Sequence, residues 1–364
     1  MLTFVIIINP ISLSPIVTEK EAEQRGAVYQ IHSARPKGMS LKAFQKIEKC
    51  WRRRKRTEEL YPPSKLPPLG TDLQVMMTRE EVENLIFLHE ENLGKLGQAV
   101  TDDSGNTLTD LVAEGKLKNA VPANASDAHR NQRFSDCAVV ASGATLQGAS
   151  LGKKIDEHQV VVRINQAPTA SSKRIVGSKT SIRLINNLWT KSYAKADLRR
   201  KAVESGSSST PVEGNLTIYV TRPSADDYMK LLRHSQQFRK DVELRIVSSR
   251  IVSMVRDRLL APYRKKLEMA GVDEFKAALL EGRDTPSSGL VAVFLMIQLC
   301  GSVTAYGFSG INDGSKYHYW KSNRQYQNRT HSFSAERALL RRLAYELDTF
   351  FFVEGNTDNV KSFV

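Results

Sequence analysis

The stretch 137–169 reads "CAVVASGATLQGASLGKKIDEHQVVVRINQAPT", and its pattern is informative about the fold. It begins with a short apolar run, passes through a loop rich in Gly, Ser and Ala, and ends in a β-branched run at 159–164. Strand, glycine loop, helical turn and strand is the order in which α/β proteins build nucleotide sites. Its glycines fit neither G-x-G-x-x-G nor the P-loop pattern. The stretch therefore indicates a phosphate-bearing ligand and leaves the identity of that ligand open.

Further apolar runs along the chain extend this pattern into a whole domain. We predict strands at 138–140, 160–164, 181–185, 216–220, 244–247 and 303–306, and helices at 252–270, 289–300 and 334–350. The stripe that predicts the last helix is Leu339, Leu343, Leu347 and Phe350. Strands alternating with helices favour an α/β fold, with a mainly parallel, Rossmann-like sheet flanked by helices on both faces.

The 364 residues divide into three expected parts. Residues 1–70 combine an apolar start with a basic, Pro-rich stem, and residues 71–132 form a variable helical lead-in. In that lead-in, Thr78-x-x-Glu81 is a capping box, and Val82, Leu85, Ile86 and Leu93 recur at helical spacing. The main domain is expected over 133–364, and its polar stretch 204–213 predicts a surface loop.

The N-terminus is apolar for about eight residues and is then broken by Asn9-Pro10. That run is shorter than the roughly 20 residues of a membrane span. A truncated signal-anchor, a buried strand and an artefact of where the sequence starts all remain open. Three N-x-S/T sequons, at Asn124, Asn215 and Asn328, fit a secretory protein.

The net charge of +14 favours anionic partners such as nucleic acid, acidic lipid, acidic glycans or a nucleotide-sugar. The run "RRRKR" at 52–56 is compatible with a nucleic-acid arm or with a solvated stem. No aromatic stacking pattern accompanies it, so we favour the stem and expect no nucleic-acid partner. Three cysteines, Cys50, Cys137 and Cys300, leave room for one bridge and one spare thiol, and they show no metal-ligand spacing.

A second informative stretch, residues 284–310, reads "DTPSSGLVAVFLMIQLCGSVTAYGFSG". Pro286 blocks an upstream helix, Ser287 or Ser288 can serve as N-cap, and an apolar helix then runs to Cys300. The N-terminus of a helix can hold a phosphate or carboxylate, and Ser287, Ser288 and Gly289 are small enough to let a ligand approach. Two further pieces follow, "YHYW" at 317–320 and "HSFSAE" at 331–336, in which His331 and Glu336 can face each other.

Together the four pieces resemble the sialyltransferase-like family of eukaryotic glycosyltransferases (glycosyltransferase family 29). Residues 137–180 are similar to the family's large motif, 286–308 to its small motif, 317–320 to its third motif and 331–336 to its very small motif. The resemblance covers roughly residues 133–350 and makes 133–364 the expected catalytic domain.

The resemblance implies a GT-A-like variant fold and a Cys137–Cys300 disulfide, which in turn implies an oxidising compartment. It also implies transfer of a nine-carbon acidic sugar from its CMP ester to a glycan hydroxyl, with inversion. The donor is a substrate, so we expect no cofactor and no metal, and the sequence has no Asp-x-Asp. Family membership further implies a Golgi location with type II topology, and membrane association through the incomplete N-terminal anchor.

Position by position, the resemblance makes His331 the catalytic base and Glu336 a residue that supports the site. It places His318 near the departing phosphate, where a protonated imidazole helps the leaving group. The implied donor-binding residues are Ser142, Gly143, Thr145, Asn165, Ser287, Ser288, Gly289 and Tyr319.

Two departures from the family pattern bear on the donor. Ser142 and Thr145 stand where the large motif commonly has asparagines, and a hydroxyl offers one donor where an amide offers two. The histidine of the third motif also comes one place later than usual, at His318. CMP-Kdo is therefore an alternative donor, for a cell-wall or glycan acceptor. A non-catalytic nucleotide- or glycan-binding member and a nucleic-acid binder are the remaining hypotheses.

Overall fold

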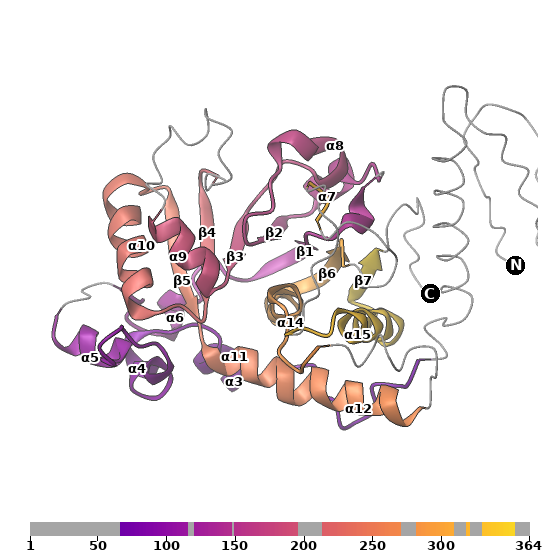
Figure 1. Ribbon diagram of the computed structural model, residues 1–364, viewed down its shortest axis with the longest axis horizontal. Coiled ribbons are helices and arrows are strands. Elements are labelled where there is room, and N and C mark those ends of the chain that lie inside the picture. Colours follow the sequence, from indigo (N-terminus) through magenta and orange to yellow (C-terminus); the bar gives the residue numbers. More distant parts are fainter. Residues whose placement is uncertain are drawn as a thin grey trace, which may run out of the picture. The chain divides into compact units, whose positions relative to one another are not determined.

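The computed structural model describes residues 66–115, 120–147, 149–195, 213–270, 282–308, 318–320 and 330–353. Their centre is one sheet of seven strands in the order β5-β4-β3-β2-β1-β6-β7 (Figure 1). The strands are β1 (Phe134–Val140), β2 (Val160–Ile164), β3 (Ile182–Ile185), β4 (Leu216–Thr221), β5 (Val242–Val247), β6 (Cys300–Tyr306) and β7 (Phe350–Val353). Every neighbouring pair is parallel, so the predicted α/β fold with a parallel sheet is confirmed.

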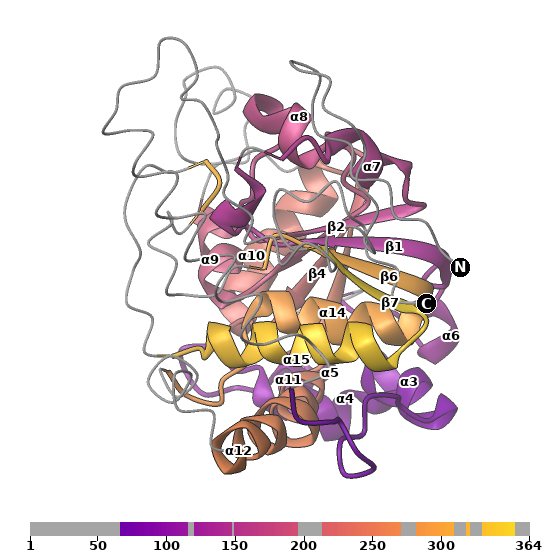
Figure 2. The ribbon, with the colours of Figure 1, turned by 90° about the vertical axis from the view of Figure 1, so that its right-hand side faces the viewer.

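Helices cover both faces of this sheet (Figures 1 and 2). One face carries α14 (Ser288–Leu299), α15 (Phe333–Glu346) and the helical run α11 (Ser249–Met254), Val255–Leu260 and α12 (Ala261–Met269). The other carries α7 (Gly152–Glu157), α8 (Lys173–Val176), α9 (Asn187–Lys195) and α10 (Ala225–Phe238). The lead-in adds α3 (Arg79–Leu85), α4 (Glu90–Leu96), α5 (Leu108–Ala113) and α6 (Ala125–Ala128).

Burial on both faces explains why the central strands are continuously apolar. In β1, Cys137 and Val139 pack into the core under α14, whereas Ala138 and Val140 pack into the core under α7 and α8. Helix α14 is buried at all its residues, as expected of a helix that is apolar all round. It packs against β1, β2, β3 and β6, and its position is therefore fixed relative to the sheet.

A disulfide joins Cys137 in β1 to Cys300 at the start of β6, with the two Cα atoms 6.2 Å apart. This is the pairing that the family resemblance implies, and Cys50 lies outside the described residues. The bridge spans 163 positions of sequence. In the chain-entropy model, closing a loop of this size stabilises the fold by about 5 kcal/mol at most.

Two predicted helices are shorter than their sequence periodicity indicates. The closing helix ends at Glu346, and Phe350 begins strand β7, which pairs with β6. The prediction of a helix as far as Phe350 is wrong. The aromatic run 350–352 has strong β propensity and pairs with β6 as the edge strand of the sheet. The helix that Thr78 and Glu81 cap ends at Leu85, so Leu93 belongs to the separate helix α4.

The segment between α3 and α4 pairs with the edge strand of the sheet. Phe87 forms an antiparallel bridge with Val247, and the N–H of Leu88 donates to the carbonyl of Ile246 at 2.9 Å. The lead-in thus covers the carboxyl half of β5. Within the described ranges, no helix combines the length and the apolar character needed to cross a bilayer. Residues 1–65, with the apolar start and the basic run, lie outside those ranges, and the proposed three-part division stays a prediction.

Two of the three sequons fall on described residues. Asn124 is the N-cap of α6, where its side chain accepts from the N–H of Asp127 at 2.9 Å. Asn215 is exposed in a left-handed turn before β4, with φ 53°. Asn328 lies outside the described residues. Glycosylation at all three sites stays a prediction.

Candidate active site

The carboxyl ends of the parallel strands meet at one edge of the sheet, and that edge gathers most of the predicted site. The chain leaves β1 toward β2 on one side and returns to β6 on the other side of β1. Such a reversal of strand order opens a crevice beyond the strand ends, where α/β proteins bind ligands. The loop after β1 and the turn after β6 therefore mark the expected ligand position.

The loop after β1 is packed against the turn after β6. The N–H groups of Ala141 and Gly143 donate to the carbonyls of Tyr306 and Gly307, at 2.8 and 2.9 Å. Gly307 has φ 76°, and a Cβ there would lie 2.5 Å from Leu146. Only glycine fits this contact. The large-motif loop is thereby held at the carboxyl edge of the sheet, with Ser142 half-buried and Thr145 buried.

The third motif is attached to the same loop. His318 forms an antiparallel bridge with Gly143, and the N–H of Tyr319 donates to the carbonyl of Ser142 at 3.1 Å. The ring of His318 stacks on Trp320, with centroids 4.3 Å apart. Tyr319 is buried, and its hydroxyl donates to the carbonyl of Pro168. The sequence predicted Tyr319 as a donor-binding residue, but its hydroxyl is engaged inside the protein.

Asn165 follows β2 directly in a left-handed conformation, with φ 52°. Asparagine tolerates this region better than most residues. Its Oδ1 accepts from the N–H of Asn186 at 3.2 Å, which leaves the amide nitrogen as the group that can donate to a ligand. The backbone carbonyl of Asn165 accepts from the fully buried guanidinium of Arg183.

Arg183 is a supporting residue that the sequence reasoning missed. Its guanidinium pairs with Glu213, which lies just before β4 and belongs to the stretch predicted as a surface loop. Burial raises the pKa of Glu213, but the charge and hydrogen bond of Arg183 outweigh it and hold that pKa below its ordinary value. Arg183 thus links Glu213 to the backbone that carries Asn165.

His331 is positioned by a backbone contact with the segment before α14. It forms an antiparallel bridge with Asp284, and a Cβ on Gly282, which has φ 86°, would lie 2.2 Å from its carbonyl oxygen. Nδ1 of His331 lies 2.8 Å from the carbonyl of Thr285. Because a carbonyl only accepts, Nδ1 carries the proton, and the neutral ring presents its lone pair at Nε2.

The charge state of His331 suits a base. Burial lowers its pKa, the hydrogen bond to Thr285 raises it, and the positive charge of Arg222 lowers it again, so the pKa lies below the ordinary value. The imidazole is therefore neutral at pH 7. A neutral imidazole with a fixed tautomer can accept a proton.

Glu336 contacts a different residue from the one predicted. Among the described residues its side chain bonds to Ser287, not to His331: the N–H and hydroxyl of Ser287 donate to its two oxygens at 2.7 and 2.5 Å. Burial raises the pKa of Glu336 to about 7, against the opposing effect of the Ser287 hydrogen bonds. Glu336 therefore fixes the start of α14, and the expectation that it faces His331 is replaced.

The N-terminus of α14 is partly used by the protein itself. Ser287 is the N-cap, and its Oγ accepts from the N–H of Leu290 at 3.2 Å. A Cβ on Gly289 would lie 2.9 Å from the ring of Phe308, so that ring occupies the space that glycine leaves. The N–H groups of Ser288 and Gly289 belong to the first turn, whose amides have no partner inside a helix. They are the donors that the helix can offer to an anion.

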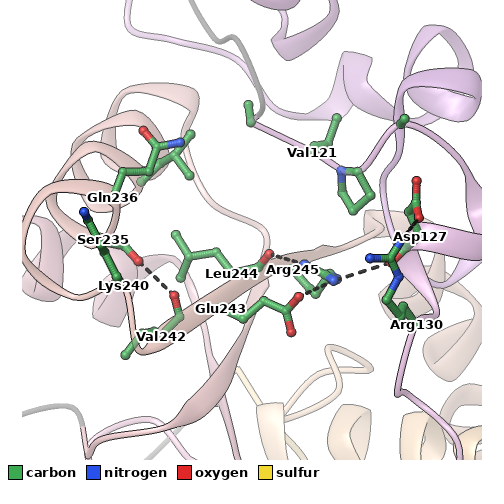
Figure 3. A pocket seen from close by; sticks show the side chains of 14 residues that line it. Val121, Asp127, Arg130, Ser235, Gln236, Lys240, Val242, Glu243, Leu244 and Arg245 are labelled. Atoms are coloured by element: carbon green, nitrogen blue, oxygen red, sulfur yellow. Dashed lines mark hydrogen bonds and ion pairs between the residues drawn. The ribbon is translucent and has the colours of Figure 1, made fainter.

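A groove of about 670 Å³ lies elsewhere, beside the first residues of β5 and the end of α10 (Figure 3). It is at the amino edge of the sheet and contains none of the predicted site residues. Two ion pairs line it, Arg130 with Asp127 and Arg245 with Glu243. This groove offers no histidine and is not the candidate site.

Comparison with known proteins places the chain in a family. The model of glycosyltransferase family 29 (sialyltransferase) matches residues 75–347, which is more than half of the chain. The chain belongs to glycosyltransferase family 29. The match includes all four motifs that the sequence suggested, so the resemblance stated from those motifs is confirmed.

Individual relatives of this family 29 chain are distant. The bovine beta-galactoside alpha-2,6-sialyltransferase 2 is 28% identical over 181 residues, 49% of this chain and 34% of that protein. Mouse CMP-N-acetylneuraminate-beta-galactosamide-alpha-2,3-sialyltransferase 1 is 26% identical over 60% of this chain and 58% of that protein. Arabidopsis beta-1,6-galactosyltransferase GALT29A is 27% identical over 58% of this chain and 52% of its own length. The match spans about a third of the bovine relative.

A crystal structure of a mammalian sialyltransferase aligns with 80% of this chain and all of that chain, at 19% identity and a TM-score of 0.49. At that similarity the alignment carries no argument about the site. The site is therefore argued from this chain's own contacts.

Proposed function

We propose that this family 29 chain is an inverting glycosyltransferase. It moves sialic acid from CMP-sialic acid to a hydroxyl of a glycan acceptor, with no metal and no cofactor. The observation that carries the proposal is the contact between Nδ1 of His331 and the Thr285 carbonyl at 2.8 Å, because it leaves Nε2 as the basic nitrogen. This nitrogen belongs to the carboxyl edge of the sheet, where the large and third motifs meet.

In the proposed reaction, the acceptor oxygen attacks the anomeric carbon of the donor while the bond from that carbon to the CMP phosphate oxygen breaks. The hydroxyl proton passes to Nε2 of His331, and CMP leaves with the bonding electron pair. A monophosphate leaving group carries less charge than a diphosphate. A protonated His318 beside the Gly143 loop can supply the required hydrogen bond.

Donor binding is proposed for the residues around the crevice. The amide nitrogen of Asn165 and the hydroxyls of Ser142 and Thr145 suit ribose and cytosine, with Gly143 providing a close backbone. The first-turn N–H groups of Ser288 and Gly289 suit the phosphate or the donor carboxylate. Ser287 and Tyr319, whose hydroxyls are used internally, hold these groups in place. Glu336 supports the same helix start.

CMP-Kdo is the second donor that we consider, because hydroxyls replace the family asparagines at Ser142 and Thr145. A relative whose name is that of a galactosyltransferase adds a nucleotide-activated galactose to the donors worth testing. The glycan acceptor and the linkage depend on residues beyond these motifs. A Golgi location follows from the proposed function and from the oxidising compartment that the disulfide indicates.

The test is CMP release by the purified full chain from CMP-sialic acid and from CMP-Kdo, with EDTA present, with and without a mixed glycan acceptor pool. UDP release from UDP-galactose is measured in parallel. We expect release from a CMP donor that requires acceptor and is lost in His331→Gln, and the faster donor identifies the sugar. CMP binding without turnover would indicate a non-catalytic member. Absence of CMP binding in the folded protein would overturn the proposal.

A further inference from the structure

Three strands of the sheet end in the same unusual way. The first residue after β2, β4 and β6 has a left-handed backbone: Asn165 with φ 52°, Arg222 with φ 53° and Gly307 with φ 76°. Glycine and asparagine adopt this conformation readily, but in arginine the Cβ makes it unfavourable. Gly307 accepts a hydrogen bond from the loop after β1, and Asn165 belongs to the proposed donor site. Arg222 is the third member of the set and has no role so far.

The turn that carries Arg222 is fixed on both sides. Before Arg222, the hydroxyl of Thr221 donates to the carbonyl of Ile185 at 3.1 Å. After it, the N–H of Ser224 donates to Oδ1 of Asn187 at 3.2 Å. Ser224 is also the N-cap of α10, and the intervening Pro223 is buried. A residue held in a strained conformation by a rigid surround is typical of functional sites.

The guanidinium of Arg222 lacks the partners that comparable arginines have. Arg163, Arg183, Arg245 and Arg258 all donate to carboxylates or carbonyls. Arg222 is half-buried, and burial lowers its pKa, yet it forms no hydrogen bond or ion pair with any residue in the described ranges. A partly desolvated cation without a counter-ion is costly unless a ligand supplies one.

Arg222 directly follows β4 at the carboxyl edge of the sheet, the edge that also holds the proposed base His331, and its positive charge lowers the pKa of His331. Donor anions already have a candidate cradle in the first-turn amides of α14. A general base lies next to the attacking hydroxyl, so a cation that follows β4 at the same edge, outside the donor cradle, is available to the acceptor. The net charge of +14 fits an anionic acceptor as well.

We propose that Arg222 is an acceptor-specificity residue that binds a sugar carboxylate of an acidic glycan, such as a uronate, next to the hydroxyl that reacts. A guanidinium holds a carboxylate through two parallel hydrogen bonds, and this geometry distinguishes an acidic sugar from its neutral counterpart. The inference rests on the proposed transferase function and adds a substrate class to it.

The test compares two acceptor disaccharides that differ only in a terminal glucuronic acid or glucose. In wild type, kcat/KM is expected to favour the acidic acceptor, and Arg222→Gln is expected to lower the acidic-to-neutral ratio about 10- to 100-fold, the range of a charge-assisted contact. Arg222→Lys should retain part of the preference. Arg245→Gln, on the opposite edge, serves as the matched control and should leave the ratio unchanged.

A binding measurement separates this inference from the proposed function. Ligand-observed NMR of the same two disaccharides, with CMP present, needs no turnover and can be run on His331→Gln. Loss of binding of the acidic disaccharide in Arg222→Gln supports the inference even if no donor is transferred. Equal losses on both acceptors, a wild type with no acidic preference, or unchanged selectivity in Arg222→Gln would each overturn it.

Discussion

At the amino ends of the strands the charged side chains beside the groove meet each other, whereas at the carboxyl ends His331 contacts a carbonyl and Glu336 a hydroxyl. Arg130 pairs with Asp127 and Arg245 with Glu243 beside the groove. Across the sheet, His331 bonds a carbonyl and Glu336 bonds Ser287. Pairing of opposite charges is what a surface needs for solubility and stability. Titratable groups with shifted pKa values mark the edge where chemistry is expected.

The largest expected difference between the edges is in rate. His331→Gln should lower kcat/KM about 10²- to 10⁴-fold, the usual contribution of a general base. Arg245→Gln at the other edge should leave kcat/KM within the error of the assay. In wild type, kcat/KM should fall as the pH drops through the pKa of His331, which lies below its ordinary 6.5. Steady-state kinetics on protein shown to be folded by circular dichroism tests this prediction. A His331→Gln variant that keeps the activity of wild type would show that His331 is not the base.

The second effect concerns stability. Arg183→Met should lower the free energy of unfolding by about 3–5 kcal/mol, because it leaves Glu213 as an uncompensated, largely buried charge. The double variant Arg183→Met with Glu213→Leu should recover part of this loss. Urea denaturation followed by fluorescence measures both. CMP affinity should fall in the single variant, since Arg183 also holds the carbonyl of Asn165; a stable, fully binding single variant would contradict the role.

The third effect depends on pH and comes from Glu336. Its pKa rises from 4.5 to about 7 on folding, so the folded state favours the protonated acid. Its contribution to stability is present below pH 4.5 and is lost as the pH rises through about 7. Glu336→Gln cannot lose a proton. Relative to wild type, its unfolding free energy should therefore gain up to about 3 kcal/mol between pH 5 and pH 8.

The control for that series is Glu81→Gln, whose carboxylate pairs with Arg258. The hydrogen bond from Arg258 holds the pKa of Glu81 below its ordinary value, so the unfolding free energy of this variant relative to wild type should stay level between pH 5 and pH 8. A parallel slope in both variants would mean that the effect does not arise at Glu336.

The smallest effect is at the groove. Arg130→Gln breaks an exposed pair with Asp127 and should change the free energy of unfolding by less than about 1 kcal/mol. It should also leave CMP binding unaltered. A loss of activity in this variant would show that the amino edge takes part in function after all.

Much of the fold could be predicted because burial on both faces leaves a plain mark in the sequence. All six predicted strands exist, and the Thr78 capping box and the Ser287 N-cap depend only on neighbouring residues. Strand β7 was missed because its pairing with β6 is a long-range contact that the aromatic run 350–352 alone does not reveal. Leu347 and Phe350 continued a helical stripe that the chain itself abandons after Glu346.

The candidate site, like the fold, could be predicted from the sequence only in part. Motif order brought His331, His318 and Asn165 to one edge of the sheet, as the resemblance implied. The partners of these residues were out of reach: the Thr285 carbonyl and Arg183 carry no motif, and Glu336 bonds Ser287 across a separation of 49 residues. Hydrogen bonds between distant segments follow from tertiary packing, and local spacing says little about them. Arg222 could be found only through its backbone angle and its lack of a described partner.

The Cys137–Cys300 bridge has a consequence for how this molecule opens. It ties together β1 and β6, the two strands that border the ligand crevice. Reversible local unfolding of the kind that hydrogen exchange detects should therefore begin at the outer strands β5 and β7 and reach this pair last. Backbone amides of β1 and β6 should be among the slowest to exchange. The crevice would then outlast most of the sheet around it when the protein is mildly denatured.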